Sequence, residues 1–224
     1  MTFFWNIVSS VVASVIVILA AGLLSRTART MLIGALGRLV DIDVETVFRN
    51  PREAAPDVQR ELERASRVDL LTGRGSELER ETFAGLLGAR AATRRRPFRL
   101  LLPDPRPASG TTDWTADREA EVARFDPAFG GGVLAGQIDS TIAFLAKTVE
   151  QGLVSMRLFN YPHVGRILIT DRVAYFTPYR ADAHSRDCRV IKYRRSGEMY
   201  DHLSRLFDQL WRTATPPATS AKPR

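Results

Sequence analysis

Residues 157–179 read RLFNYPHVGRILITDRVAYFTPY, and this stretch decides the fold. Apolar and β-branched residues fill Arg166–Thr170 and Val173–Thr177, a composition typical of strands. Only Asp171 and Arg172 separate the two runs, so we predict that a tight hairpin joins them.

Helices and strands alternate in the rest of the pattern. The predicted helices cover Asp57–Ser66, Ser76–Ala89, Trp114–Phe125, Val133–Val149 and Glu198–Thr213. The other predicted strands cover Arg67–Leu71, Phe98–Leu102, Val154–Phe159 and Arg189–Tyr193. This order predicts an α/β domain over 57–213, built as an α/β sandwich around a mixed sheet.

The N-terminus carries an uncharged apolar run. Phe3–Leu24 is 22 residues long, and the first charged side chain is Arg26. Because about 20 apolar residues span a bilayer, we predict one transmembrane helix as an anchor over 1–25. Basic residues lie after the apolar run and none lies before it. The positive-inside rule therefore predicts an inner-membrane protein with a cytoplasmic C-terminal domain. A cleaved signal peptide fits less well, since no basic region precedes the run.

Two further segments flank the predicted domain. Thr27–Arg49 has apolar residues at helical spacing, so 26–56 is interpreted as a juxtamembrane amphipathic helix and a linker near 50–56. That helix could lie on a membrane surface, pair with a second copy or pack on the domain. The proline-rich tail 214–224 is predicted to be disordered.

The domain resembles one half of the phospholipase D-like superfamily over Glu61–Thr213. Four stretches carry the resemblance: VDLLTGRGS (68–76), LLLPDP (100–105), the hairpin region 157–179 and YDHLSRLFDQLW (200–211). It looks most like the catalytically degenerate relatives found beside bacterial regulatory modules. The resemblance implies the α/β fold and a site on the hairpin.

Active members of that superfamily carry H-x-K-x4-D on the hairpin. Anchoring the pattern on Asp171 places Arg166 at the lysine position and Val164 at the histidine position. His163 is displaced by one residue, which turns a strand side chain to the other face unless a bulge at Gly165 restores it. Active members also combine two motifs, so catalysis by His163, Arg166 and Asp171 would further require a homodimer.

The resemblance implies a ligand site at one edge of the sheet. The loop Thr72–Ser76 precedes a predicted helix N-terminus, where backbone N–H groups favour anions. We expect Arg74, Ser76, Asp104, Arg166 and Asp171 to converge on a positive concavity that binds a phosphate group. The alternatives are an ordinary glycine turn before a capped helix, and an Asp104–Arg106 pair at the surface.

Composition limits the other chemistry. The chain has 224 residues, a net charge of +7, one cysteine and three histidines, so we expect no metal site and no cofactor. Arg94–Arg96 would suit anionic lipid or nucleic acid, but no aromatic residue is interleaved with these arginines, which argues against a nucleic-acid partner. His184 and Asp187 are interpreted as a surface loop.

The leading hypothesis is a single-pass membrane protein whose non-catalytic phospholipase D-like domain binds a phosphorylated or nucleotide-like ligand, or a partner protein, in stress or defence signalling. The first alternative is a membrane-tethered phosphodiesterase, acting on phospholipid or nucleic acid as a homodimer. The second is a structural, oligomerising interaction protein.

Overall fold

The computed structural model describes residues 13–15, 17, 43–79, 83, 87 and 97–217. The strands are β1 (Val44–Phe48), β2 (Val68–Leu71), β3 (Phe98–Pro103), β4 (Ser155–Phe159), β5 (Gly165–Thr170), β6 (Val173–Pro178) and β7 (Val190–Arg194). The helices are α3 (Pro51–Arg64), α6 (Trp114–Ala123), α7 (Val133–Glu150) and α8 (Glu198–Thr213), with short 3-10 turns η1 (Ser76–Glu79) and η2 (Ser185–Asp187).

The strands form one mixed sheet in the order β1-β7-β6-β5-β2-β3-β4. The pairs β2–β3 and β3–β4 are parallel, and the other neighbours are antiparallel. The carboxyl ends of β2, β3 and β4 therefore share one edge of the sheet with the start of β5. The α/β mixed-sheet prediction is confirmed.

The β5–β6 hairpin forms where the sequence predicted it. Thr170 holds the turn, because its Oγ1 accepts hydrogen bonds from the backbone N–H groups of Arg172 and Val173, both at 3.1 Å. At the other end of β5, a Cβ on Gly165 would lie 2.5 Å from the Phe176 ring. Only glycine fits this close approach of the two strands.

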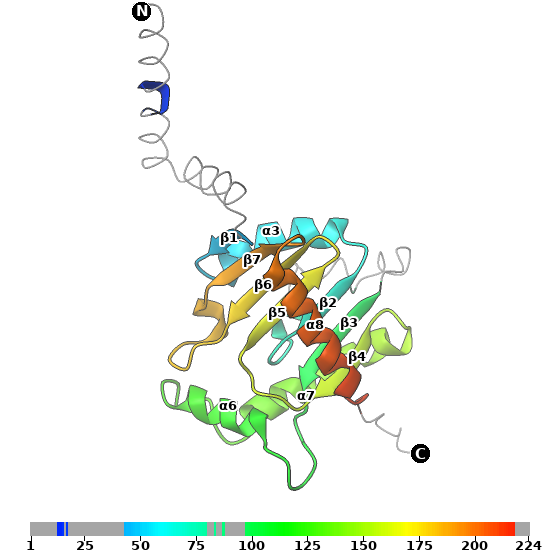
Figure 1. Cartoon of the computed structure of the whole chain (residues 1–224). Coiled ribbons are helices and arrows are strands. Elements are labelled where there is room, and N and C mark those ends of the chain that lie inside the picture. Colours follow the sequence, from blue (N-terminus) through cyan, green and yellow to red (C-terminus); the bar gives the residue numbers. More distant parts are fainter. Residues whose placement is uncertain are drawn as a thin grey trace, which may run out of the picture.

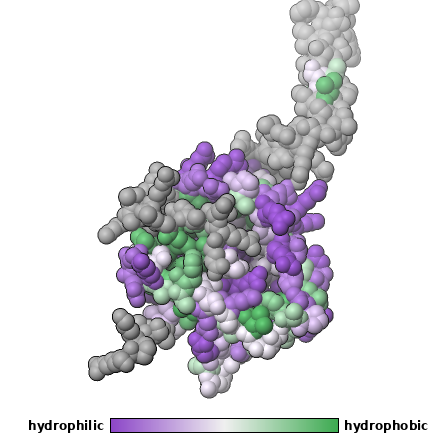
Figure 2. All heavy atoms as spheres, turned by 180° about the vertical axis from the view of Figure 1, so that it is seen from behind, coloured by the Kyte–Doolittle hydropathy of each residue, from purple (hydrophilic) through white to green (hydrophobic). Residues whose placement is uncertain are grey.

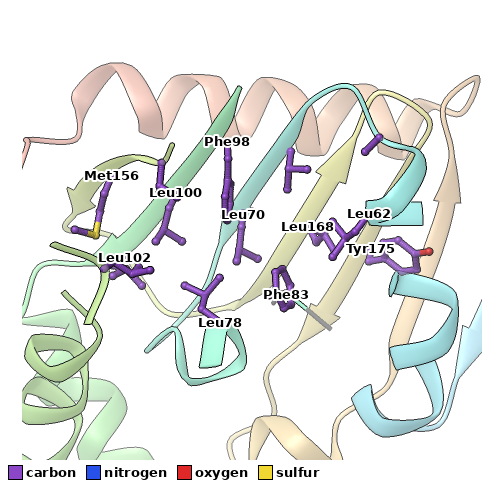
Figure 3. Packing of buried hydrophobic residues seen from close by; sticks show 14 of the residues in the cluster. Leu62, Leu70, Leu78, Phe83, Phe98, Leu100, Leu102, Met156, Leu168 and Tyr175 are labelled. Carbon is purple, nitrogen blue, oxygen red and sulfur yellow. The ribbon is translucent and has the colours of Figure 1, made fainter. Parts of the chain in front are cut away.

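Two hydrophobic cores lie on the two faces of the sheet. Helix α8 crosses one face (Figure 1) and packs Leu203, Phe207 and Leu210 against Leu101 and Ile169. On the other face, the core includes residues of α3, α7 and the sheet, together with Leu78 and Phe83, as Figure 3 shows for ten labelled side chains. Figure 2 views the molecule from behind: on the part of this face that is not grey, hydrophilic residues lie next to hydrophobic patches.

The start of the domain differs from the prediction. Residues 44–48 form a strand rather than the end of a helix, and β1 pairs with β7. The predicted linker is the beginning of α3: Asn50 caps this helix by accepting a 3.0 Å bond from the Glu53 N–H, and Pro51 occupies its first turn. The sheet domain thus begins before Asp57. Of the predicted helix Thr27–Arg49, residues 27–42 lie outside the described residues.

The predicted membrane anchor is corrected. Among the described residues, no helix is long and apolar enough to cross a membrane. The transmembrane helix, and the inner-membrane location that depended on it, are therefore withdrawn. Within 1–25 the structure describes residues 13–15 and 17, and the rest of that range lies outside the described residues.

Two other predicted segments are described in part. The predicted helix Ser76–Ala89 begins as the 3-10 turn η1. Of its later residues the structure describes Phe83 and Leu87, and both are helical. The predicted disordered tail starts too early, because Thr215 exchanges backbone hydrogen bonds with Leu158 of β4 at 2.7 and 3.0 Å. Residues 218–224 lie outside the described residues.

Candidate functional site

The shared sheet edge gathers part of the predicted site. The loop after β2, the turn after β3 and the start of β5 all lie there, because β2 and β3 are parallel and β5 is antiparallel to β2. Asp171 follows the opposite end of β5. It is five residues beyond Arg166, or about 16 Å along the strand at roughly 3.3 Å per residue.

Arg166 is the central side chain of this edge. Its Nη1 lies 3.6 Å from Oε1 of the buried Glu77, and its Nη2 donates a 3.4 Å hydrogen bond to Thr177 Oγ1. Glu77 also accepts a hydrogen bond from the hydroxyl of Thr72. A guanidinium, a carboxylate and two hydroxyls from the β2 loop, η1, β5 and β6 therefore form one connected cluster. The sequence pattern did not single out Glu77.

Tyr179 fastens the hairpin to the loop after β2. Its hydroxyl accepts a 3.2 Å hydrogen bond from the Gly73 N–H, and the Arg118 guanidinium lies 5.4 Å from its ring centroid. Burial raises the pKa of Tyr179, so the phenol stays protonated at neutral pH. Tyr179 thus fixes the position of the loop beside Arg166.

Arg74 and Ser76 take a different place from the one predicted. Arg74 Nη1 donates a 2.9 Å hydrogen bond to Gln137 of α7, and the Arg74 carbonyl accepts one from Thr141 at 2.7 Å. Gly75 has φ +77°, and a Cβ there would lie 2.5 Å from Thr141 Cγ2. Ser76 begins η1. The loop packs on α7, and Arg74 does not meet Arg166 across a concavity.

Asp104 closes its own turn. Its Oδ1 accepts a 2.9 Å hydrogen bond from the Arg106 N–H, while the Arg106 side chain binds Asp139 of α7 at 2.7 and 2.8 Å. Asp104 therefore orients neither of the predicted ligand arginines. The expected side-chain pair between Asp104 and Arg106 is replaced by this backbone contact.

Asp171 caps the other end of the hairpin. Its Oδ1 accepts a 2.8 Å hydrogen bond from the Ser66 N–H. Burial alone would raise the pKa of Asp171, but the hydrogen bonds from Ser66 and nearby backbone lower it overall. Asp171 binds the loop before β2 and does not join Arg166.

His163 lies in the loop before β5 and packs on Phe159, with ring centroids 5.9 Å apart. Burial lowers the pKa of His163 to about 4, and the positive charge of Arg118 contributes. The β5–β6 register is regular from Gly165 onward, so no bulge turns this histidine back. Of the three degenerate-motif residues, only Arg166 belongs to the cluster.

A cavity of about 280 Å³ opens beside Arg166, between α3 and the sheet. Its charged lining residues are Arg52, Glu77 and Arg166. Figure 3 shows Leu70, Leu168, Phe83 and Tyr175 on this face of the sheet. Arg52, from the predicted linker, is the second arginine at this cavity, and Arg74, which was predicted to be there, is not among the lining residues. The remaining walls come from α3, the sheet and Phe83: Pro51, Ala54, Ala55, Val58, Leu70, Phe83, Leu168, Tyr175 and Val190.

An ionic cluster fixes α3 next to this cavity. The buried Lys192 Nζ lies 2.9 Å from Asp57, 3.1 Å from Glu45 and 3.5 Å from Glu61. Tyr175, a cavity wall, donates a 2.7 Å hydrogen bond to Asp57. Burial opposes the charge on Lys192, yet the carboxylates of Asp57 and Glu45 raise its pKa overall. The lysine therefore stays charged and holds β1, α3 and β7 together.

Within the described residues, no group of three or more His, Cys, Asp or Glu side chains could hold a metal ion. His184 Nε2 lies 3.0 Å from Asp126, and Asp187 pairs with Arg186 at 3.6 Å. Arg94–Arg96 lies outside the described residues.

No protein-family model matches the chain. No curated protein matches it either. Among solved structures, the chain is similar to TrmBL2, an archaeal chromatin protein described as showing a novel mode of DNA binding. The TM-score is 0.47, with 14% identical residues over 93% of this chain and 67% of that one.

Proposed function

We propose that this chain is a non-catalytic, phospholipase D-like binding domain for a small phosphorylated or nucleotide-like ligand. One observation carries the proposal: Arg166 and Arg52 line the same largely apolar cavity of about 280 Å³. A cavity with apolar walls and a few convergent polar groups is the usual form of a small-molecule site.

The lining suits a ligand with two chemically different parts. A phosphate would bind Arg166, whose planar guanidinium matches phosphate geometry with two parallel hydrogen bonds. A flat or aliphatic group would lie against Val58, Leu168 and Tyr175. An adenine nucleotide has both parts.

Glu77 makes the site selective. Without ligand, its carboxylate balances the charge of Arg166 at 3.6 Å. An incoming anion must compete with Glu77 for the guanidinium of Arg166. A weakly charged ligand would therefore gain little binding free energy from this arginine. The phospholipase D-like resemblance supports a phosphate-binding role for this position of the hairpin, and the displacement of His163 supports binding without hydrolysis. The alternative function is that of a homodimeric phosphodiesterase.

Calorimetric titration of the full chain tests the proposal. The probes are adenosine monophosphate, cyclic adenosine monophosphate, glucose 6-phosphate and inorganic phosphate. We expect a nucleotide to bind more tightly than inorganic phosphate, and Arg166→Met to weaken binding at least tenfold, since a hydrogen bond to a charged group contributes about 1.5–3 kcal/mol.

The matched control is Arg106→Met, which removes an exposed arginine at the same sheet edge without touching the cavity. Equal binding by wild type and Arg166→Met, or no binding by any probe, would overturn the proposal. The domain would then be better regarded as a protein-interaction module. Loss of a phosphodiester bond during the titration, absent in His163→Ala, would favour the enzyme instead.

A further inference from the structure

A second hollow lies on the α8 face of the sheet, away from the cavity under α3. It measures about 530 Å³ and is lined by Arg99, Arg205, Asp208, Gln209, Trp211 and Arg212. Residues 205, 208, 209 and 212 follow the i, i+3, i+4, i+7 spacing of one helix stripe. One polar stripe of α8 therefore forms a wall of this groove, which we call the α8 groove.

The α8 groove carries an excess of positive charge. Three of its lining residues are arginines, and Asp208 is the one carboxylate among them. Arg99 already binds Asp208 at 2.8 Å, so the positive charge offered to a ligand comes from Arg205 and Arg212. Arg205 pairs with Asp201 at 2.8 Å, but both side chains are exposed, so this pair is weak in water. Arg205 and Arg212 stand about 10 Å apart along the helix, at 1.5 Å per residue. The groove thus presents two cations to an extended anion.

Flat groups lie beside these cations: Arg99 and Trp211 line the groove, and the fully buried Phe207 packs against both. Trp211 stacks on Phe207 with centroids 6.0 Å apart and planes at 14°. The Arg99 guanidinium lies 4.9 Å from the Phe207 centroid and 5.4 Å from that of Trp211, and Arg157 lies 4.9 Å from Trp211.

Hydrogen bonds hold this stack in place. Asp69 accepts two bonds from Arg99, at 2.7 and 2.8 Å, and the Trp211 carbonyl accepts one from Arg157 at 2.7 Å. The stack is therefore ordered before any partner binds, which lowers the entropy cost of recognition.

We propose that the α8 groove binds single-stranded nucleic acid. Such a strand alternates phosphates with flat bases, and proteins bind it with basic grooves that also offer aromatic and guanidinium planes. An acidic peptide would satisfy Arg205 and Arg212 but has no flat group for the Arg99–Trp211 stack. The sequence argued against nucleic acid because no aromatic residue is interleaved with Arg94–Arg96. Folding brings other arginines next to an aromatic residue, since Arg99, Arg157 and Trp211 come from β3, β4 and α8.

Fluorescence anisotropy with a labelled 12-nucleotide oligo-dT, titrated with the full chain, tests this proposal. The variant Arg205→Glu/Arg212→Glu reverses two surface charges without touching the core, so we expect its Kd to rise at least tenfold, with a smaller salt dependence. Arg186→Glu reverses an exposed arginine in η2 and serves as the control, for which we expect at most a twofold change. Trp211→Leu should raise the Kd at least fivefold if bases use the stack.

Two competitors separate the outcomes. A 12-residue poly-glutamate should fail to displace the oligonucleotide at concentrations where unlabelled oligo-dT does. Equal displacement by poly-glutamate would assign the groove to an acidic protein. If oligo-dT does not bind at all, the proposal is wrong. Arg166→Met should bind oligo-dT like wild type, so failure of this site and failure of the cavity site are distinguishable.

Discussion

The guanidinium of Arg166 lies 3.6 Å from the carboxylate of Glu77, and both side chains line the cavity beneath α3. Burial makes this pair sensitive to the loss of one partner, because little water is available to solvate the charge that remains. Under the proposed function, this pair sets how strongly the cavity attracts an anion.

Replacing Glu77 by Gln should strengthen anion binding. The amide keeps an acceptor for the Thr72 hydroxyl but no longer competes for Arg166. We expect the affinity for adenosine monophosphate to rise three- to tenfold by calorimetry. Asp139→Asn, which frees the exposed Arg106 at the same edge, should leave it unchanged. Weaker binding in Glu77→Gln would mean that the carboxylate contacts the ligand instead.

Asp69 and Asp208 both bind Arg99, yet they should differ in their effect on stability. The Asp69 side chain is 1% exposed and that of Asp208 is 52% exposed. Asp69→Asn should lower the free energy of unfolding by about 3 kcal/mol, because both Arg99 and Arg67 lose their buried carboxylate partner. Asp208→Asn should cost under about 1 kcal/mol. Urea denaturation of the two variants measures the difference, and equal losses would contradict it.

Two glycines with positive φ provide a matched test of packing. Gly75 and Gly110 have φ values of +77° and +85°, but only at Gly75 would a Cβ meet a neighbour, Thr141, at 2.5 Å. Alanine at either position should cost about 1 kcal/mol for the backbone conformation. Gly75→Ala should cost a further 1–3 kcal/mol, roughly, for overpacking. Thermal unfolding that ranks Gly110→Ala as equally destabilised would argue against the contact between this loop and α7.

Acid should destabilise the fold through His163. Its pKa is about 4 in the folded chain and 6.5 as a free side chain. Between these values the unfolded chain binds a proton that the folded chain does not, so the free energy of unfolding falls as the pH falls from 6.5 towards 4. The loss amounts to about 3 kcal/mol.

His163→Phe should flatten this part of the pH profile, measured by urea denaturation between pH 7 and 4. His202→Gln, which removes an exposed histidine of α8, should leave the profile unchanged. A profile that is the same in wild type and His163→Phe would show that His163 is not held neutral by burial.

Local patterns predicted most of the fold. Hydrophobic residues recur with a clear period in the β5–β6 hairpin, α7 and α8. The bounds of these elements agree with the prediction to within a residue or two. β1 was misinterpreted because its partner β7 is remote in the sequence, and a strand of five residues has too few positions to distinguish two periods. Asn50 and Pro51 resemble a linker but also match a helix N-cap followed by proline at the first turn.

The site was harder to predict because its members meet only after folding. That the β2 loop and Arg166 lie at the same edge follows from strand direction; in the structure Glu77 links Arg166 to Thr72 of this loop. The same reasoning places Asp171 at the far end of β5. Sequence reasoning alone could therefore have excluded Asp171 from the predicted site. Glu77 and Arg52 carried no motif, and their roles depend on how η1 and α3 pack on the sheet.

A crystal structure of the full chain with adenosine monophosphate tests the central claim most directly. The account predicts a phosphate oxygen within about 3.2 Å of an Arg166 guanidinium nitrogen. It also predicts the base against Leu168 and Tyr175 in the cavity beneath α3. A nucleotide found only in the α8 groove, or a cavity that stays without nucleotide at saturating concentration, would contradict it.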